Sequence, residues 1–180
     1  MIKRFKIEGL ALYIPRKFED DRGYFFESFN EDFFRKEIGN FHFKQDNQSQ
    51  SSKGVLRGLH FQAPPYEQGK LVRVIKGSVY DVAVDIRKSS PTFGQHQVVE
   101  LSEENNHVFW IPPGFAHGFV ALEEDTIFSY KCTNLYHAAS EGALHYNDPQ
   151  LDIDWGVSNP LISGKDEQAP LLEDFNSPFE

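Results

Sequence analysis

From residue 55 onward the sequence breaks into short runs rich in β-branched and aromatic residues, and this pattern constrains the fold more than any other feature. The runs occupy residues 55–62, 70–77, 78–87, 96–102, 107–112, 117–123 and 126–133. Glycine, proline, asparagine or serine separates most of them, and no helical pattern lies between them. This spacing is typical of an antiparallel sandwich or barrel rather than of a parallel sheet with alternating helices. We therefore expect a mainly β protein.

The flanking segments predict additions to this core. Residues 5–14 alternate loosely between apolar and polar and predict strands. Asn30 opens NEDFFRKEIG, which has acids in its first turn and ends at Gly39, as a capped helix does. The last forty residues are rich in Asp, Pro, Ser and Gly and predict loops with a short helix, covering an edge or one end of the barrel. We expect one domain over 1–180, with an N-terminal elaboration (about 1–50), a jelly-roll core (51–137) and C-terminal loops and tail (138–180).

Composition narrows the class of function. Eighteen lysines and arginines stand against 27 aspartates and glutamates, a formal net charge of −9, so the chain lacks the basic surface that nucleic-acid binding requires. Two or three well-placed cations can still bind a small anionic ligand. The single cysteine, Cys132, excludes an intrachain disulfide and a cysteine-rich zinc site, which indicates a reducing compartment. No segment approaches about 18 apolar residues and no signal peptide is evident, so we expect a cytoplasmic protein without membrane segments.

Residues 111–119, IPPGFAHGF, contain a Pro-x-Gly-x-x-His turn, the second signature of the cupin jelly rolls, in which that histidine commonly binds a metal. The first cupin signature has His-x-His followed by a glutamate. Here the histidine pair becomes His60-x-Gln62, and Lys70 stands where counting back from Gly77 places the carboxylate. A divalent metal prefers neutral imidazoles and carboxylates, and a lysine repels it. We therefore expect a cavity without metal, with a cation where the ion would be.

The same positions fit acid–base chemistry. A histidine free of metal ordinarily titrates near pH ~6.5 and can accept a proton at neutral pH, so His60 is a candidate base. Lys70 can stabilise an oxyanion that develops nearby. Tyr130 is the candidate acid on another wall, and Asp166 can orient the imidazole through its second nitrogen. Taken singly, each of these residues is more common in a structural role.

Arg57 and His60 pose a geometric problem. A regular strand would place their side chains on opposite faces, because successive residues alternate. For both to face one cavity, the strand needs a bulge near Gly58 or the cavity needs a wide mouth.

Seven segments follow one another at the spacings of one known family. They are FEDDRGYFFE (18–27), QDNQSQSSKGVLRGLHFQ (45–62), QGKLVRVIKGSVYDVAVDIRKSSPTFG (68–94), IPPGFAHGF (111–119), YKCTNLY (130–136), NDPQLDIDW (147–155) and SGKD (163–166). On these motifs the sequence resembles the dTDP-4-dehydrorhamnose 3,5-epimerases. The resemblance spans roughly residues 2–170 and leaves only the acidic tail outside.

The resemblance implies a cupin-type jelly roll without metal or cofactor, in a homodimer whose N-terminal segments exchange across the interface. It implies that dTDP-4-dehydro-6-deoxy-D-glucose is epimerised at C3 and C5, with His60 as the base and Asp166 as its partner. Tyr130 would be the proton donor, and Lys70 would lie near the C4 oxygen. The positions expected to line the nucleotide-sugar site are Arg22, Glu27, Gln45, Asn47, Arg57, His117, Tyr136, Glu141 and Lys165. Of these, Arg22 and Glu27 are expected to serve the neighbouring subunit, and Phe25 and Tyr136 are the candidates to stack on thymine.

Several alternatives remain open on the sequence. Relatives that invert only C3 or only C5 can keep the His, Asp and Tyr, so sequence discriminates them poorly. Enzymes that move the ketone are usually shorter and lack the SGKD region. A non-catalytic cupin binding module would lose the acid–base residues, and a metal-dependent cupin oxygenase is disfavoured by Gln62 and Lys70.

Overall fold

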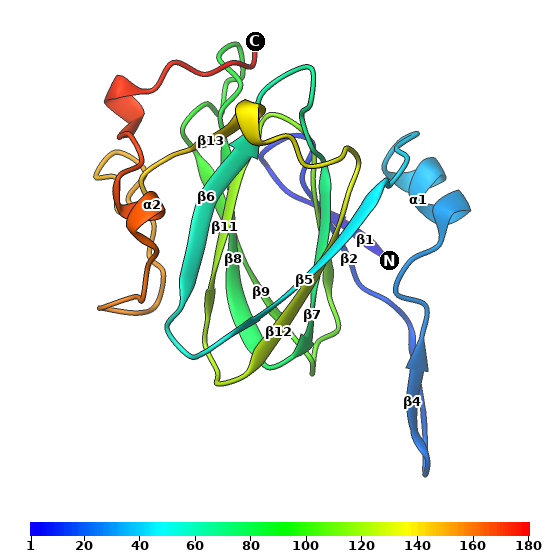
Figure 1. Cartoon of the computed structure of the whole chain (residues 1–180). Coiled ribbons are helices and arrows are strands. Elements are labelled where there is room, and N and C mark those ends of the chain that lie inside the picture. The colour runs from blue at the N-terminus through cyan, green and yellow to red at the C-terminus, as the bar shows by residue number, and fades with distance from the viewer.

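A computed structural model describes all 180 residues, which form thirteen strands, two short α-helices and two 3₁₀ turns (Figure 1). The strands are β1 (Ile2–Arg4), β2 (Ala11–Tyr13), β3 (Lys17–Asp20), β4 (Gly23–Phe26), β5 (Gln45–Ser51), β6 (Leu56–Gln62), β7 (Lys70–Lys76), β8 (Ser78–Asp85), β9 (His96–Ser102), β10 (Val108–Ile111), β11 (Phe115–Ala121), β12 (Thr126–Cys132) and β13 (Glu141–Ala143). The helices are α1 (Glu31–Glu37) and α2 (Gly164–Glu167), and the 3₁₀ turns are η1 (Ala138–Ser140) and η2 (Leu172–Asp174).

Two antiparallel sheets face each other across a shared interior (Figure 1). One has the order β1-β2-β10-β7-β12-β5 and the other β13-β6-β11-β8-β9. Neighbours such as β7 and β12 are far apart in sequence, which is the non-sequential pairing of a jelly roll. The expected mainly β, cupin-type fold is confirmed.

Side chains from both sheets fill one end of the interior. Val72, Phe109 and Phe128 come from the first sheet, and they pack with Val79 and Phe119 from the second in one buried apolar cluster. Because side chains alternate along a strand, the same strands direct every second residue outward. Phe119 and Phe128 of this cluster also line the cavity described below, together with polar residues from both sheets.

The C-terminal segment covers the outer face of the second sheet. Leu151, Trp155 and Phe179 pack there against Val82 and Val120 in a second buried cluster. This differs from the expectation that the tail covers an edge or an end. Strands β8 and β11 are buried on both faces along most of their length, so the outer face also requires a cover.

The N-terminal fifty residues elaborate the first sheet. Strands β1 and β2 extend it beyond β10, with a turn over residues 6–9, so only part of the predicted 5–14 strand region is strand. Helix α1 begins after Asn30, whose Oδ1 accepts a hydrogen bond from the Phe33 amide at 3.0 Å, and ends close to Gly39 as expected.

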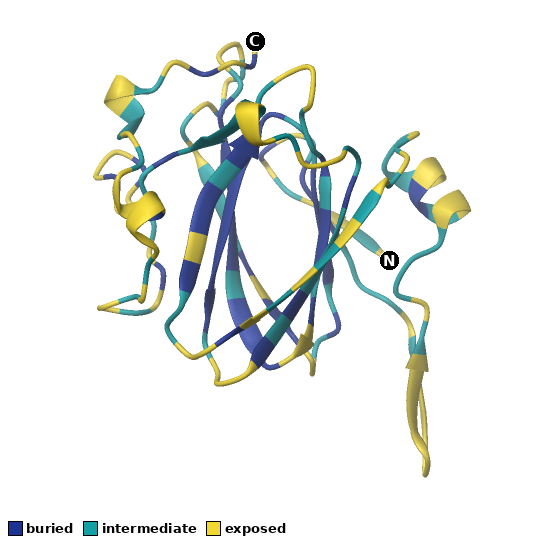
Figure 2. Ribbon diagram, in the orientation of Figure 1, coloured by how far each residue is buried: buried dark blue, intermediate teal, exposed yellow.

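The hairpin β3–β4 projects away from the body of the molecule (Figures 1 and 2). Its aromatic side chains are exposed: Phe18 is 50% exposed, Tyr24 54% and Phe25 70%. No helix of the protein is long and apolar enough to cross a membrane.

Candidate active site

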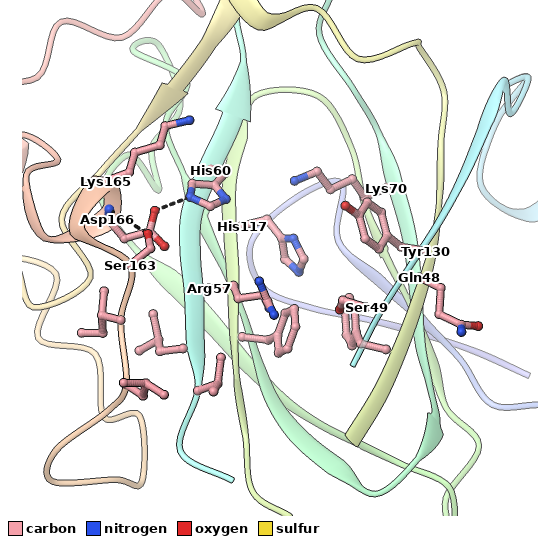
Figure 3. Close-up of a pocket in the computed structure, with 16 residues that line it drawn as sticks. Gln48, Ser49, Arg57, His60, Lys70, His117, Tyr130, Ser163, Lys165 and Asp166 are labelled. Carbon is pink, nitrogen blue, oxygen red and sulfur yellow. Dashed lines mark hydrogen bonds and ion pairs between the residues drawn. The ribbon is translucent and has the colours of Figure 1, made fainter. Parts of the chain in front are cut away.

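A cavity of about 550 Å³ opens between the two sheets. Polar residues from both sheets and from helix α2 line it (Figure 3). The polar lining residues are Gln48, Ser49, Arg57, His60, Lys70, His117, Tyr130, Ser163, Lys165 and Asp166. All four predicted catalytic residues are therefore brought to one site.

His60 and Asp166 form a dyad, as expected from the sequence. The imidazole Nε2 lies 2.6 Å from Oδ1 of Asp166, whose side chain is almost fully buried (Figure 3). The carboxylate is held in place because Ser163 caps the short helix α2 and the Gly58 amide donates to the second oxygen at 3.4 Å. Because the carboxylate accepts a hydrogen bond from Nε2, Nδ1 of His60 is left as the ring nitrogen that can take a proton.

A bulge at Gly58 places Arg57 and His60 in the same cavity. On β11, His117 pairs with His60 and Phe119 pairs with Arg57, so β6 carries one residue more than its partner between these pairs. The sequence-based expectation of a distortion here is confirmed. Gly58 has a φ of 133°, and a Cβ there would lie 2.5 Å from the Gly118 Cα. The bulge therefore requires glycine.

Lys70 enters the cavity from β7, on the same face of the strand as the buried Val72 and Val74. Its side chain forms no ion pair within 4 Å, and burial lowers the pKa of its ammonium below the ordinary lysine value. Arg57 also lacks a carboxylate partner, because its guanidinium donates to Ser51 Oγ at 3.1 Å and to the Gln50 carbonyl at 3.4 Å. Two unpaired cations facing one cavity suit an anionic ligand.

Tyr130 lies across the cavity from His60, beside Lys70 (Figure 3). It comes from β12 in the first sheet, whereas His60 comes from β6 in the second. Burial raises the pKa of the Tyr130 phenol, and Arg57 opposes that shift. The phenol is therefore protonated at neutral pH and is able to donate a proton.

Several predicted nucleotide-sugar residues form a network at the cavity mouth. Oε2 of Glu141 accepts hydrogen bonds from Lys165 at 2.7 Å and from the Tyr136 hydroxyl at 2.9 Å. Burial raises the pKa of Glu141, but these two hydrogen bonds lower it further, so the pKa lies below its ordinary value. The Tyr136 amide donates to Gln45 at 2.8 Å, and Gln45 in turn donates to Asn47. Of these residues only Lys165 lines the cavity, and the others connect to it through these hydrogen bonds.

Arg22 and Glu27 do not reach this cavity. Arg22 lies at the exposed tip of the β3–β4 hairpin and pairs with Asp20. The Glu27 carbonyl accepts a hydrogen bond from the Tyr13 hydroxyl at 3.2 Å. Neither residue lines the site formed by its own chain.

Two polar residues have partners that the sequence did not indicate. Gln62 occupies the position of a metal-binding histidine in other cupins, yet its amide holds the backbone of Tyr66, Leu135 and His137. Asp81 was not singled out, although it is a fully buried acid that bonds His117 Nε2 at 2.9 Å. The sequence does contain an indication of this role, because Asp81 interrupts the β-branched run SVYDVAVDIR, where a buried strand normally has apolar residues.

Comparison with known proteins identifies the group to which this arrangement belongs. The family model described as dTDP-4-dehydrorhamnose 3,5-epimerase matches residues 4–174. The chain belongs to this epimerase family. A dTDP-4-dehydrorhamnose 3,5-epimerase from Salmonella typhimurium is 55% identical over 93% of this chain and 92% of its own length.

Solved structures of epimerases share the fold over nearly the whole chain. A dTDP-6-deoxy-D-glucose-3,5-epimerase from Legionella pneumophila, in complex with dTDP-4-keto-L-rhamnose, superposes with a TM-score of 0.94 at 49% identity, covering 98% of this chain and 94% of its own. A 3′-monoepimerase from Streptomyces bikiniensis, in complex with dTDP-quinovose, superposes with a TM-score of 0.90 at 35% identity, covering 94% and 86%.

Proposed function

We propose that this epimerase converts dTDP-4-dehydro-6-deoxy-D-glucose to dTDP-4-dehydro-L-rhamnose by inverting C3 and C5. The observation that carries the proposal is that a candidate base and a candidate acid lie on opposite walls of one cavity. One wall holds an imidazole oriented by a buried carboxylate, and the other holds a protonated phenol beside an unpaired lysine. The roughly half-identical relatives, which carry the same activity in their names, support it.

The C4 ketone makes this chemistry possible, because it acidifies the hydrogens on both neighbouring carbons. Nδ1 of His60 takes the proton from C3 or C5, and the electron pair of the C–H bond moves to form an enolate with its charge on O4. Lys70 stabilises that charge. Tyr130 then gives a proton to the same carbon from the opposite face, which inverts it. His60 then releases its proton to solvent and the Tyr130 phenolate takes one up from solvent, which restores both groups. The same two proton transfers repeat at the second carbon, with no net oxidation.

Arg57, which has no carboxylate partner, and Lys165 account for binding of the nucleotide diphosphate. Arg57 presents a guanidinium fork suited to phosphate oxygens. Lys165 can exchange its bond with Glu141 for a phosphate at the mouth of the cavity. Tyr136 is linked to Lys165 through Glu141, and its exposed ring offers a surface on which thymine could stack. Gln45 and Asn47 extend the same hydrogen-bond network.

We also propose that the active protein is a cytoplasmic homodimer in which each β3–β4 hairpin reaches the partner's cavity. Arg22 and Glu27 are far from their own chain's cavity, and the hairpin exposes Phe18, Tyr24 and Phe25. Exposed aromatic surface of this kind marks an interaction site. A twofold dimer would place two hairpins and two cavities in equivalent positions.

Complementation between two inactive variants tests the exchange of hairpins. Arg22→Ala and His60→Ala are each expected to lose most activity alone, but co-expressed they form mixed dimers with one intact site. Random pairing makes about half the dimers mixed, each with one of two sites working, so about a quarter of wild-type activity should return. The measurement is the specific activity of all co-expressed dimers. Purification through two different tags isolates the mixed dimers, and their specific activity should rise to about half that of the wild type. If verified mixed dimers recover no activity, the site is not shared between the subunits.

Single-carbon epimerases are the second candidate, because the Streptomyces bikiniensis monoepimerase has the same fold. A non-catalytic binding module is the candidate from another class.

Incubation of the sugar nucleotide in heavy water, followed by NMR, separates all three. Deuterium at both C3 and C5 of the product is expected. Deuterium at one carbon supports a monoepimerase. If neither carbon takes up deuterium, the protein is not an epimerase of this sugar nucleotide. Turnover that depends on stoichiometric zinc or iron would contradict the cofactor-free mechanism.

A further inference from the structure

A second carboxylate–imidazole pair lies beside the dyad, and the mechanism above gives it no role. Asp81 stands on β8 between Val79 and Ala83, two residues of the buried interior cluster. Its side chain is fully buried, and one carboxylate oxygen lies 2.9 Å from His117 Nε2. The other oxygen, Oδ1, has no hydrogen-bond partner. A buried carboxylate is costly, so its place in an apolar strand calls for an explanation.

The pair fixes the protonation of His117. Burial lowers the pKa of His117 below its ordinary value, as do the nearby charges of Lys70 and His60, although Asp81 opposes the shift. A neutral imidazole has one N–H, and the carboxylate can only accept a hydrogen bond, so that hydrogen stands on Nε2. Nδ1 of His117 is then a bare acceptor at the cavity, cross-strand from His60.

The charges around the cavity give Asp81 a second role. The cations are Arg57 on β6 and Lys70 on β7, and neither forms an ion pair. Burial raises the pKa values of the neighbouring Tyr130 and Cys132 on β12, so both are neutral. Glu141 on β13 is bound to Lys165.

Two carboxylates therefore remain to balance two cations. One is Asp166, which is committed to His60 through a 2.6 Å bond. The other is Asp81. Burial lowers the pKa of Lys70, and Asp81 opposes that shift together with Cys132 and Glu141. A charge placed this way favours the cationic form of a buried amine.

We propose that Asp81 is a positioning residue for the epimerisation: it holds His117 as the neutral, Nε2-protonated tautomer and supplies the negative charge that keeps Lys70 cationic. Lys70 can stabilise an enolate oxygen only while it is charged. Nδ1 of His117, as a bare acceptor, is suited to a sugar hydroxyl next to the ketone. The inference rests on the proposed function and extends it to a residue that does not touch the substrate.

The test is the pH dependence of kcat in Asp81→Asn. Removing the carboxylate lowers the pKa of Lys70 further, so the alkaline limb of the profile is expected to move to lower pH. At neutral pH, kcat should fall about 10- to 100-fold, the range known for removing a carboxylate that orients a metal-binding histidine. Asp85→Asn is the matched control, because Asp85 is also fully buried on β8 but pairs with Arg87. Its alkaline limb should coincide with that of the wild type.

Histidine NMR gives a second readout that does not depend on turnover. In ¹⁵N-histidine-labelled wild-type protein, the His117 resonance, assigned by its absence in His117→Ala, should report a neutral ring protonated at Nε2 across the active pH range. A cationic ring, or a hydrogen on Nδ1, overturns the proposal even if Asp81→Asn does not fold. An unmoved alkaline limb in folded Asp81→Asn overturns it as well. A wild-type protein without epimerase activity but with the expected tautomer would instead contradict the proposed function alone.

Discussion

Replacing His60 with alanine is expected to lower kcat by about 10⁴-fold or more and to abolish deuterium exchange at both C3 and C5. Both carbons lie next to the same ketone, so one base can serve each of them in turn. Two imidazoles in the cavity are held by carboxylates, and His60 is the one that lies 2.6 Å from Asp166 and faces Tyr130 across the cavity. Without it, neither C–H bond can be broken and no product of either inversion forms.

The variant Asp166→Asn tests whether the carboxylate orients the His60 imidazole, while leaving the imidazole itself in place. An amide in place of the carboxylate can donate to Nε2, which would move the imidazole hydrogen to Nδ1 and block the base. We expect a loss of about 10³- to 10⁴-fold in kcat with little change in KM. The measurement is exchange of substrate hydrogens in heavy water, followed by NMR.

His42→Ala is the control for these variants, because His42 is a surface histidine with a 67% exposed side chain. Its activity should remain close to that of the wild type. If His60→Ala retains near-full exchange at either carbon, the base is another residue. If Asp166→Asn retains full activity, Asp166 has only a structural role.

The sequence predicted the barrel well, because its strands carry their own signals. The runs at 70–77 and 126–133 became β7 and β12, and Asn30 capped a helix as expected. The bulge at Gly58 could also be predicted, because two polar side chains three residues apart had to face one cavity. These features depend on residues that are close together in the sequence, so a single sequence is enough to predict them.

The features that sequence did not predict depend on pairing between distant segments. The C-terminal segment covers the outer face of a sheet, and no local signal says which face it will cover. Gln62 was interpreted as a replaced metal ligand, but the loops at Tyr66 and Leu135 fold back to bind its amide. Asp81 was overlooked because a lone aspartate in a strand gains meaning only when the register brings His117 against it. Burial and partners are properties of the fold, and they decide the role of each polar side chain.

The dyad and the lysine act on different parts of the same step. His60 removes a proton from carbon, whereas Lys70 receives the charge that this removal creates on oxygen. The fold separates them onto facing sheets, so the sugar ring must lie between the two for both to act (Figure 3). Burial makes Lys70 more effective, because a charge in a water-poor cavity is screened less than one at the surface.

Lys70→Met is therefore expected to lower kcat by about 10²- to 10³-fold while leaving KM nearly unchanged. Methionine fills similar space without charge, so the fold should tolerate it, and the loss would measure stabilisation that exists only after the C–H bond breaks. Deuterium exchange at C3 and C5 should slow as much as product formation, because enolate formation itself is impaired. Tyr130→Phe should differ, since it slows product formation more than the first deprotonation.

Lys76→Met is the matched control, because Lys76 lies on the same strand with a 53% exposed side chain and does not line the cavity. Its kcat and KM should both match the wild type. The decisive comparison is between kcat and KM in Lys70→Met. A raised KM with unchanged kcat would mean that Lys70 binds the ground state and transition state equally, through the anionic diphosphate rather than the ketone oxygen. In that case the enolate charge must be stabilised by another group, and the assignment of Lys70 to O4 is wrong.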